Sequence, residues 1–386
     1  MIDRPILVNV ERLNRYLDEH KLAAVVARSG NNFTYLSGIA YPGTLARHLD
    51  LADSPRGVYL IWPRKGEPAI VLNAIAEKLT RRDSWVRRIE VYAGYVEPPV
   101  KCLCDVLADM GLAEQRVGFE KDYINARDWE YIAGRLPKLA IVDCTAMMNQ
   151  VRWVKTPGEI ALLKKGADLL DDAYLEVFPT IQHGETERAV HSRLIASCIR
   201  RGANWAHGIL NSDRNTVPYG GESDSQFLRG DVVRTDYVAY VDGYPGHQSR
   251  NAIMGEPSAE QMKDYRTIRA IYGAASEKLR PGTTAGEVFA FVAERFEKAG
   301  RPYHSMLAGH GVGCWWHQQD PVISRGNLIV LEEGMVIAME PHVDHWHIQD
   351  MFVVRRDGPE LISSKFPTDE PYVITLDGAM RAKAMT

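Results

Sequence analysis

The Asp-Gly pair at positions 242 and 243 constrains the fold of this chain more than any other local feature. It interrupts the strand-like run VVRTDYVAYVDGYPGHQSRN, and Asp-Gly is a strong signal for a two-residue hairpin turn. With that turn, residue i pairs with residue 485 − i, since 242 + 243 = 485. Asp236 then faces Ser249, and His247 is its diagonal neighbour on the same face of the sheet. The turn therefore predicts that Asp236 and His247 converge; the alternative is a surface hairpin with polar side chains.

The composition predicts a globular protein of two domains. The chain has 386 residues, of which 45% are hydrophobic and 25% are charged. Its net charge of −4 argues against a nucleic-acid-binding surface. There is no apolar run of the roughly 20 residues that span a membrane, and the N-terminus lacks the apolar core of a signal peptide. We therefore expect a cytoplasmic protein that binds neither nucleic acid nor a membrane.

The cysteines do not form a disulfide pattern. An odd, scattered set predicts free, mostly buried thiols in a reducing compartment. The five residues are Cys102, Cys104, Cys144, Cys198 and Cys314.

The first 152 residues have the pattern of an α/β domain. A helical apolar spacing over residues 10–20 precedes the buried strand LAAVVA, and the strands GVYLIW and AIVLNA flank a Pro/Gly loop typical of a hairpin. Two more strands, RVGFE and AIVDC, surround a helix. The boundary lies near VRWVKTPGE, where Thr156 suits an N-cap, Pro157 the first helical position and Glu159 a capping box. We predict domains at 1–152 and 153–386.

The second domain has the pattern of an α+β fold. A long helix follows Pro157, and SAEQMKDYRTIRAIYGAASEKL and TAGEVFAFVAERFEKAG are two more amphipathic helices. Strands are expected at 231–254, 327–343 and 346–356. This order predicts helices that cover an antiparallel sheet.

Residues able to bind metals or transfer protons gather in the second domain. Seven of the twelve histidines fall within about a hundred residues: 247, 304, 310, 317, 342, 345 and 347. Glycines flank His310 in GHGVG, which allows close approach of a ligand to the backbone. Glu340 stands in an apolar strand, and His347 and Gln349 share one face of the next. Several ligand-type residues on separate strands predict a metal site or a catalytic cleft.

The motifs together resemble the pita-bread superfamily of prolidase, aminopeptidase P, methionine aminopeptidase and creatinase. The spaced Asp of the hairpin, GHGVG, LEEGMVIAMEP and the closing IQD carry this resemblance in the second domain. NNFTYLSG and VRWVKTPGE resemble the N-terminal domain and junction of the creatinase/prolidase branch. The resemblance implies a pita-bread catalytic domain preceded by a creatinase-like α/β domain, and it implies a homodimer.

The peptidases of this superfamily hold two metal ions with Asp, Asp, His, Glu and Glu. The resemblance places Asp236, His247, His310, Glu340 and Gln349 at these positions, so two carboxylates are replaced. In the family those two carboxylates bridge the ions. A neutral imidazole or amide cannot supply two anionic oxygens to two cations that repel each other. We therefore expect the two-metal centre to be lost.

Further replacements distinguish this chain both from the peptidases of the superfamily and from creatinase. Tyr219 stands where related enzymes place a histidine that handles a proton or the substrate. The two glutamates that hold creatine in creatinase correspond to Ser249 and Ile348. His317 matches the family's second histidine, which contacts substrate near the scissile bond.

The remaining residues suit one metal ion or none. His247, His310 and Glu340 form a set for a single Zn²⁺, Mn²⁺ or Fe²⁺, with Gln349 as a weak further ligand and Asp236 free to orient or deprotonate water. Without a metal, His247 is the candidate general base. Aromatic residues near the motifs favour a compact substrate, with Trp315 expected to bind it alongside Tyr219 and His317. The neighbouring aromatic residues are Trp205, His207 and Trp316. His342 and His345 are expected at solvated positions, and the alternative is that they are additional ligands.

We predict a hydrolase that cleaves a C–N bond of a small molecule, such as an amide, an amidine or a proline-like compound. Three alternatives remain: an Xaa-Pro metallo-aminopeptidase, a lyase on the same scaffold, and a non-catalytic binding protein. Retention of Asp236, His310, Glu340 and His317 argues against the last, because a pure binding protein need not keep them.

Overall fold

The computed structural model describes residues 6–376 except 218 and 222, and it divides them into two units. Unit 1 runs to Gly158 and includes Cys314–Trp316, and unit 2 contains Glu159–Gly313 and the chain from His317 onward. The chain therefore passes from one unit to the other within the first turn of the long helix α8 (Pro157–Val177), which begins at the proline that the sequence indicates. All five cysteines are free, as expected.

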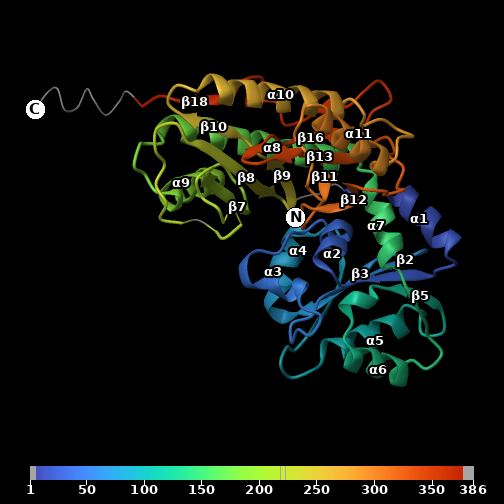
Figure 1. Cartoon of the computed structure of the whole chain (residues 1–386). Coiled ribbons are helices and arrows are strands. Elements are labelled where there is room, and N and C mark those ends of the chain that lie inside the picture. Colours follow the sequence, from blue (N-terminus) through green and yellow to red (C-terminus); the bar gives the residue numbers. More distant parts are fainter. Residues whose placement is uncertain (1–5, 218, 222, 377–386) are drawn as a thin grey trace, which may run out of the picture. The chain divides into compact units, whose positions relative to one another are not determined.

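Unit 1 is built on a six-stranded mixed sheet, which agrees with the predicted α/β domain (Figure 1). Its strand order is β4-β3-β2-β1-β5-β6; β2 and β3 form the predicted antiparallel hairpin, whereas β1–β5 and β5–β6 are parallel. The strands are β1 (Ala24–Ala27), β2 (Tyr59–Pro63), β3 (Ala69–Asn73), β4 (Arg88–Tyr92), β5 (Arg116–Phe119) and β6 (Ala140–Asp143). The helices are α1 (Val10–Glu19), α2 (Gly30–Ser37), α3 (Gly43–Asp50), α4 (Glu77–Asp83), α5 (Pro99–Asp109), α6 (Ala126–Arg135) and α7 (Thr145–Trp153).

Unit 2 contains two five-stranded sheets, so the expectation of one antiparallel sheet was wrong. We call β18-β10-β8-β7, with β9 paired to β8, sheet I, and β12-β11-β13-β16-β17 sheet II. Sheet I is mixed, because β18 near the C-terminus pairs in parallel with β10. Its strands are β7 (Trp205–Ser212), β8 (Val232–Val241), β9 (Tyr244–Gln248), β10 (Asn251–Met254) and β18 (Tyr372–Ile374). Sheet II has β11 (Leu307–Gly311), β12 (Gln319–Ser324), β13 (Val336–Met339), β16 (Asp350–Val353) and β17 (Glu360–Leu361).

The strand expected at 327–343 is shorter than predicted. A turn at Gly334, whose φ is 88°, precedes β13, so this strand begins only at Val336. After Glu340 the chain forms a small separate hairpin of β14 (His342–Val343) and β15 (Trp346–His347). We call residues 342–347 the histidine hairpin.

Capping boxes begin the two amphipathic helices that the sequence predicts after the hairpin. Ser258 with Gln261 and Thr284 with Glu287 form complete capping boxes in front of α10 and α11. Of the helices, α9 packs on β7, and α11 packs on β12 and β11. These helices are α9 (Glu187–Arg200), α10 (Ala259–Ser276) and α11 (Ala285–Lys298).

The hairpin register agrees with the prediction from the Asp-Gly turn. Asp242 and Gly243 have φ of 50° and 82°, as the expected turn requires. Tyr237 pairs with Gln248 and Val238 with His247, so each pair sums to 485.

The two sheets of unit 2 meet at Ser249 and Gln349. The backbones of these residues exchange two hydrogen bonds of 3.3 Å. The neighbouring Arg250 is fully buried and donates to Asp171 of α8 at 2.7 Å, and its guanidinium lies 2.9 Å from the carboxylate of Asp350. This ion cluster joins α8 to both sheets, and Arg250 also donates to the backbone carbonyl of Gln349 at 2.7 Å.

Candidate functional site

A chain of hydrogen bonds connects four of the side chains where the two sheets meet. Nε2 of His247 lies 3.0 Å from Oδ1 of Asp236, as the turn predicts. The amide nitrogen of Gln349 lies 3.0 Å from Nδ1 of the same imidazole. Its carbonyl oxygen accepts from the hydroxyl of Ser249 at 2.8 Å. His247 is therefore a buried residue of this network and not part of a surface hairpin.

The hydrogen-bond partners limit where protons can lie in this network. Burial raises the pKa of Asp236, but the hydrogen bond and charge of His247 outweigh it and hold that pKa well below its usual range. An ionised carboxylate can only accept, so Nε2 of His247 carries the shared proton. Nδ1 can accept from the amide of Gln349 whenever the ring carries only this one proton. Both nitrogens of this imidazole are occupied by protein groups.

His310 and Glu340 meet on the side contributed by sheet II. His310 lies in β11, and Glu340 follows β13, where its backbone N–H donates to Ala308 at 2.9 Å. Nδ1 of His310 bonds the carbonyl of Gly311 at 2.9 Å, so Nε2 keeps its lone pair and lies 3.5 Å from Oε1 of Glu340. The His310 and His247 rings stack, with 5.2 Å between their centroids.

The histidine hairpin contributes His347, which the sequence analysis counted among the ligand-type residues, and His342, which was expected at a solvated position. His342 and His347 pair directly across it, with ring centroids 4.9 Å apart. Nε2 of His347 lies 3.3 Å from Oε2 of Glu340. Among the described residues, one group of three has ligand atoms that all lie within 4.8 Å of one another: Glu340, His342 and His347. The predicted trio of His247, His310 and Glu340 is not that group.

His317 adjoins the network and leads to an aromatic wall. Its ring meets that of His247 edge to face, with centroids 4.5 Å apart, and its Nδ1 lies 3.2 Å from the hydroxyl of Tyr240. Tyr240 stacks on Trp205, and Trp205 on His207 with centroids 4.4 Å apart. Trp205 is half exposed, so this wall reaches solvent. The expectation that Trp205 and His207 lie near the motifs is therefore confirmed.

The remaining predicted site residues lie at the edge of the cluster or in the other unit. Tyr219 is 69% exposed and packs against the guanidinium of Arg234 at 5.6 Å. Trp315 belongs to unit 1, where its indole nitrogen donates to Asp50 at 3.0 Å. Trp316 is exposed, and it belongs to unit 1 as well. The roles of Tyr219 and Trp315 in substrate binding stay predictions.

Burial favours the neutral form of five histidines in and around the cluster. It lowers the pKa of His310 to about 3 and that of His207 to about 4. It also lowers the pKa of His317, His342 and His347. Neutral imidazole is the form that binds metals and accepts protons.

Burial raises the pKa of the Glu340 carboxyl well above its usual range, because it disfavours the charged form. The negative charge of Asp236 raises that pKa further. A carboxyl group in these surroundings keeps a proton unless a cation binds beside it.

The donor set does not fit two metal ions. Two bridging carboxylates are replaced by His247 and Gln349, and both are engaged with each other and with neighbouring side chains. Asp236 and Glu340 carry the remaining negative charge, and the charge of Arg234 also acts on Glu340. Two carboxylates and one guanidinium leave a single net negative charge. Such a site can hold one dication, but it cannot offset the repulsion of two.

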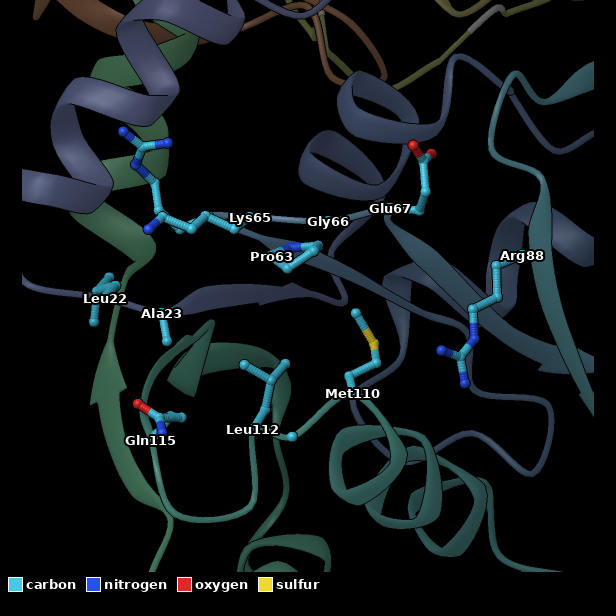
Figure 2. A pocket seen from close by; sticks show the side chains of 12 residues that line it. Leu22, Ala23, Pro63, Lys65, Gly66, Glu67, Arg88, Met110, Leu112 and Gln115 are labelled. Carbon is cyan, nitrogen blue, oxygen red and sulfur yellow. The ribbon is translucent and has the colours of Figure 1, made fainter.

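A separate pocket in unit 1 shares no residue with this cluster. It has a volume of about 530 Å³, and Figure 2 shows Met110 and Leu112 on its wall beside Lys65 and Arg88. Its arginines are already paired: Arg64 with Asp18 at 2.7 Å, and Arg88 with Asp109 at 2.6 Å. We therefore assign the candidate site to the histidine cluster of unit 2.

The fold and the cluster together define a pita-bread hydrolase domain that follows a creatinase-like N-terminal domain in the sequence. The model for the Creatinase/Prolidase N-terminal domain matches residues 9–154, and the model for Metallopeptidase family M24 matches residues 161–356. The chain belongs to metallopeptidase family M24, and as a member of this family it is a hydrolase.

Relatives span nearly the whole chain. The Xaa-Pro dipeptidase of Lactobacillus helveticus is 26% identical over 364 residues, which cover 91% of this chain and 95% of that protein. The X-Pro aminopeptidase of Thermotoga maritima has a TM-score of 0.79 at 20% identity, with 95% of this chain and 99% of that chain covered. Dipeptidase PepE of Mycobacterium ulcerans has a TM-score of 0.77 at 24% identity, with 95% and 97% covered. These structures establish the fold.

In the part of the chain that the structure describes, no helix is both long and apolar enough to span a membrane.

Proposed function

We propose that this protein hydrolyses an amide-type C–N bond of a small molecule, and that the pair Asp236–His247 handles the proton. The observation that carries the proposal is the 3.0 Å contact between Nε2 of His247 and Asp236, at the position where the superfamily's peptidases are expected to have a metal-bridging carboxylate. An aspartate that orients an imidazole and stabilises its protonated form is a recurrent arrangement for general acid–base catalysis.

The amide of Gln349 supports this role because it can serve either protonation state of His247. It donates to neutral Nδ1 while its oxygen accepts from Ser249. A half-turn of the amide would present its oxygen to a protonated Nδ1, and the hydroxyl of Ser249 can then accept instead of donate. A glutamate at this position could not donate to the neutral ring. The substitution thus suits a histidine that gains and loses a proton.

We propose that the site works with one divalent cation or with none. A bound cation would supply an electrophile for the scissile carbonyl or for water. The residues of this chain would then orient the substrate and move the proton, with His317 and its aromatic wall contacting the substrate. A homodimer and a cytoplasmic location stay predictions.

Cleavage of Xaa-Pro dipeptides is the second candidate, because the relative from Lactobacillus helveticus is an Xaa-Pro dipeptidase. The loss of the bridging carboxylates argues against it. With added Mn²⁺ or Co²⁺, we expect turnover of Xaa-Pro dipeptides well below the roughly 1–1000 per second of ordinary enzymes. A rate within that range would show that the site tolerates both replacements.

A panel of small amides, amidines and cyclic proline-like compounds, assayed beside these dipeptides, tests the proposed reaction. In water enriched in ¹⁸O, hydrolysis places the label in the product carbonyl, whereas a lyase releases an unlabelled alkene-type product. Asp236→Asn keeps the volume of the side chain and removes its charge, so we expect it to lower turnover of whichever compound the wild type hydrolyses. An absence of turnover across the panel would favour a binding protein and contradict the proposal.

A further inference from the structure

We propose that the single divalent cation of this site is held by Glu340, His342 and His347, and not by the set with His247 and His310 that the family resemblance implies. Two imidazoles and one carboxylate suit Zn²⁺, Mn²⁺ or Fe²⁺, with water or substrate completing the coordination. The inference rests on the proposed function, because it locates the cation within the same cluster.

The backbone brings the three side chains to one place. Glu340 and His342 are two residues apart, and Nδ1 of His342 lies 3.0 Å from the carbonyl oxygen of Glu340. His347 is the direct partner of His342 across the histidine hairpin, where facing side chains approach closely. The turn that makes this possible includes Asp344 at a φ of 54°. The resulting ligand atoms lie within 4.8 Å of one another.

The second nitrogen of each histidine supports metal ligation. Nδ1 of His342 lies 3.0 Å from the carbonyl oxygen of Glu340, so it carries the proton and leaves the lone pair of Nε2 available. Metal-binding histidines usually donate their other N–H in this way, to a carboxylate or backbone carbonyl.

His347 has one ring nitrogen that lacks a hydrogen-bond partner. The residue is 1% exposed, and its Nδ1 is buried without a hydrogen-bond partner. Nε2 of the same ring faces Oε2 of Glu340 at 3.3 Å and Ser249 at 3.4 Å. A buried polar atom without a partner is costly, and a cation bound at Nδ1 would remove that cost while Nε2 donates to Glu340.

The ligands that the resemblance implies are less suited to the cation. Nε2 of His247 donates to Asp236, and Nδ1, which faces Gln349, takes up the proton in the proposed reaction, which a bound cation would prevent. His310 faces the other oxygen of Glu340, Oε1 at 3.5 Å, whereas His347 faces Oε2. Glu340 therefore lies between the imidazoles of His310 and His347, and we place the cation on the side of His347.

Titration of the chelator-stripped full-length protein with Co²⁺, followed by calorimetry and visible absorption, tests the assignment. We expect one Co²⁺ per chain, and a loss of affinity of at least about 10-fold in His342→Ala and in His347→Ala, since even residues behind metal ligands contribute about 10–100-fold. His345→Ala, on the same hairpin, is the matched control and should bind as the wild type does. His247→Ala should also retain Co²⁺ binding.

The opposite pattern, with weaker binding in His247→Ala and unchanged binding in His342→Ala, would overturn the assignment in favour of the implied set. An absence of Co²⁺, Mn²⁺ and Zn²⁺ binding to the wild type would overturn it as well, while hydrolysis of the amide panel would still support the proposed function. Conversely, the expected binding pattern without any turnover would refute the function and keep the metal site. His342 is only partly buried, so His342→Ala is informative even if His347→Ala does not fold.

Discussion

His247→Ala should lower kcat at least about 100-fold on the amide that the wild type turns over fastest, because groups that transfer protons contribute about 10²–10⁴-fold. The imidazole is 3% exposed and bonds Asp236 and Gln349, so its removal eliminates the proton acceptor and leaves the carboxylate without its donor. Steady-state kinetics give kcat and KM separately, and a thermal melt shows whether the variant remains folded.

Two further variants make this result interpretable. Asp236→Asn keeps the volume of the side chain but cannot stabilise the protonated ring, so kcat should fall while KM changes little. His304→Ala removes an exposed histidine outside the cluster and should match the wild type. Full activity in a folded His247→Ala variant would show that this histidine has no part in catalysis.

Arg250→Met should lower the free energy of unfolding by about 3–5 kcal/mol, because it leaves two buried carboxylates without their cation. Arg250 is fully buried between Asp171 and Asp350, and it also donates to the backbone carbonyl of Gln349 at 2.7 Å. For a domain of this size the melting temperature should fall by roughly 6–20 °C.

The matched control for this prediction is Arg266→Ala. Arg266 also pairs with a carboxylate, Glu370, but both side chains are more than half exposed. Exposed pairs contribute at most about 1 kcal/mol, so this variant should melt close to the wild type. Equal melting temperatures for the Arg250 variant and the wild type would mean that the ion cluster does not hold the sheets together.

Local signals in the sequence were sufficient for the hairpin and for helices α8, α10 and α11 of unit 2, whereas α9 was not predicted. The Asp-Gly turn determined the register that brings Asp236 to His247, because a two-residue turn leaves no freedom in the pairing. Apolar periodicity predicted α10 and α11, and each of them begins at a capping box. In both cases the interactions that determine the structure lie within a few residues of each other.

The rest of the site depends on contacts between distant segments. The division into two sheets follows from pairings such as β10 with β18, and no local pattern indicates them. His342 and His347 were not recognised as neighbours because the turn between them, VDHW, has no glycine at the position where Asp344 adopts a positive φ. The spacing of two histidines around a short polar turn, directly after Glu340, was the available signal.

Elemental analysis of the protein purified at near-neutral pH, with excess Mn²⁺ or Zn²⁺ removed by gel filtration, tests most directly the claim that His247 and Gln349 limit this site to one cation. We predict at most one divalent ion per 43.4 kDa chain. The double variant His247→Asp/Gln349→Glu, which restores both bridging carboxylates, should retain two. Two ions per wild-type chain would contradict the account.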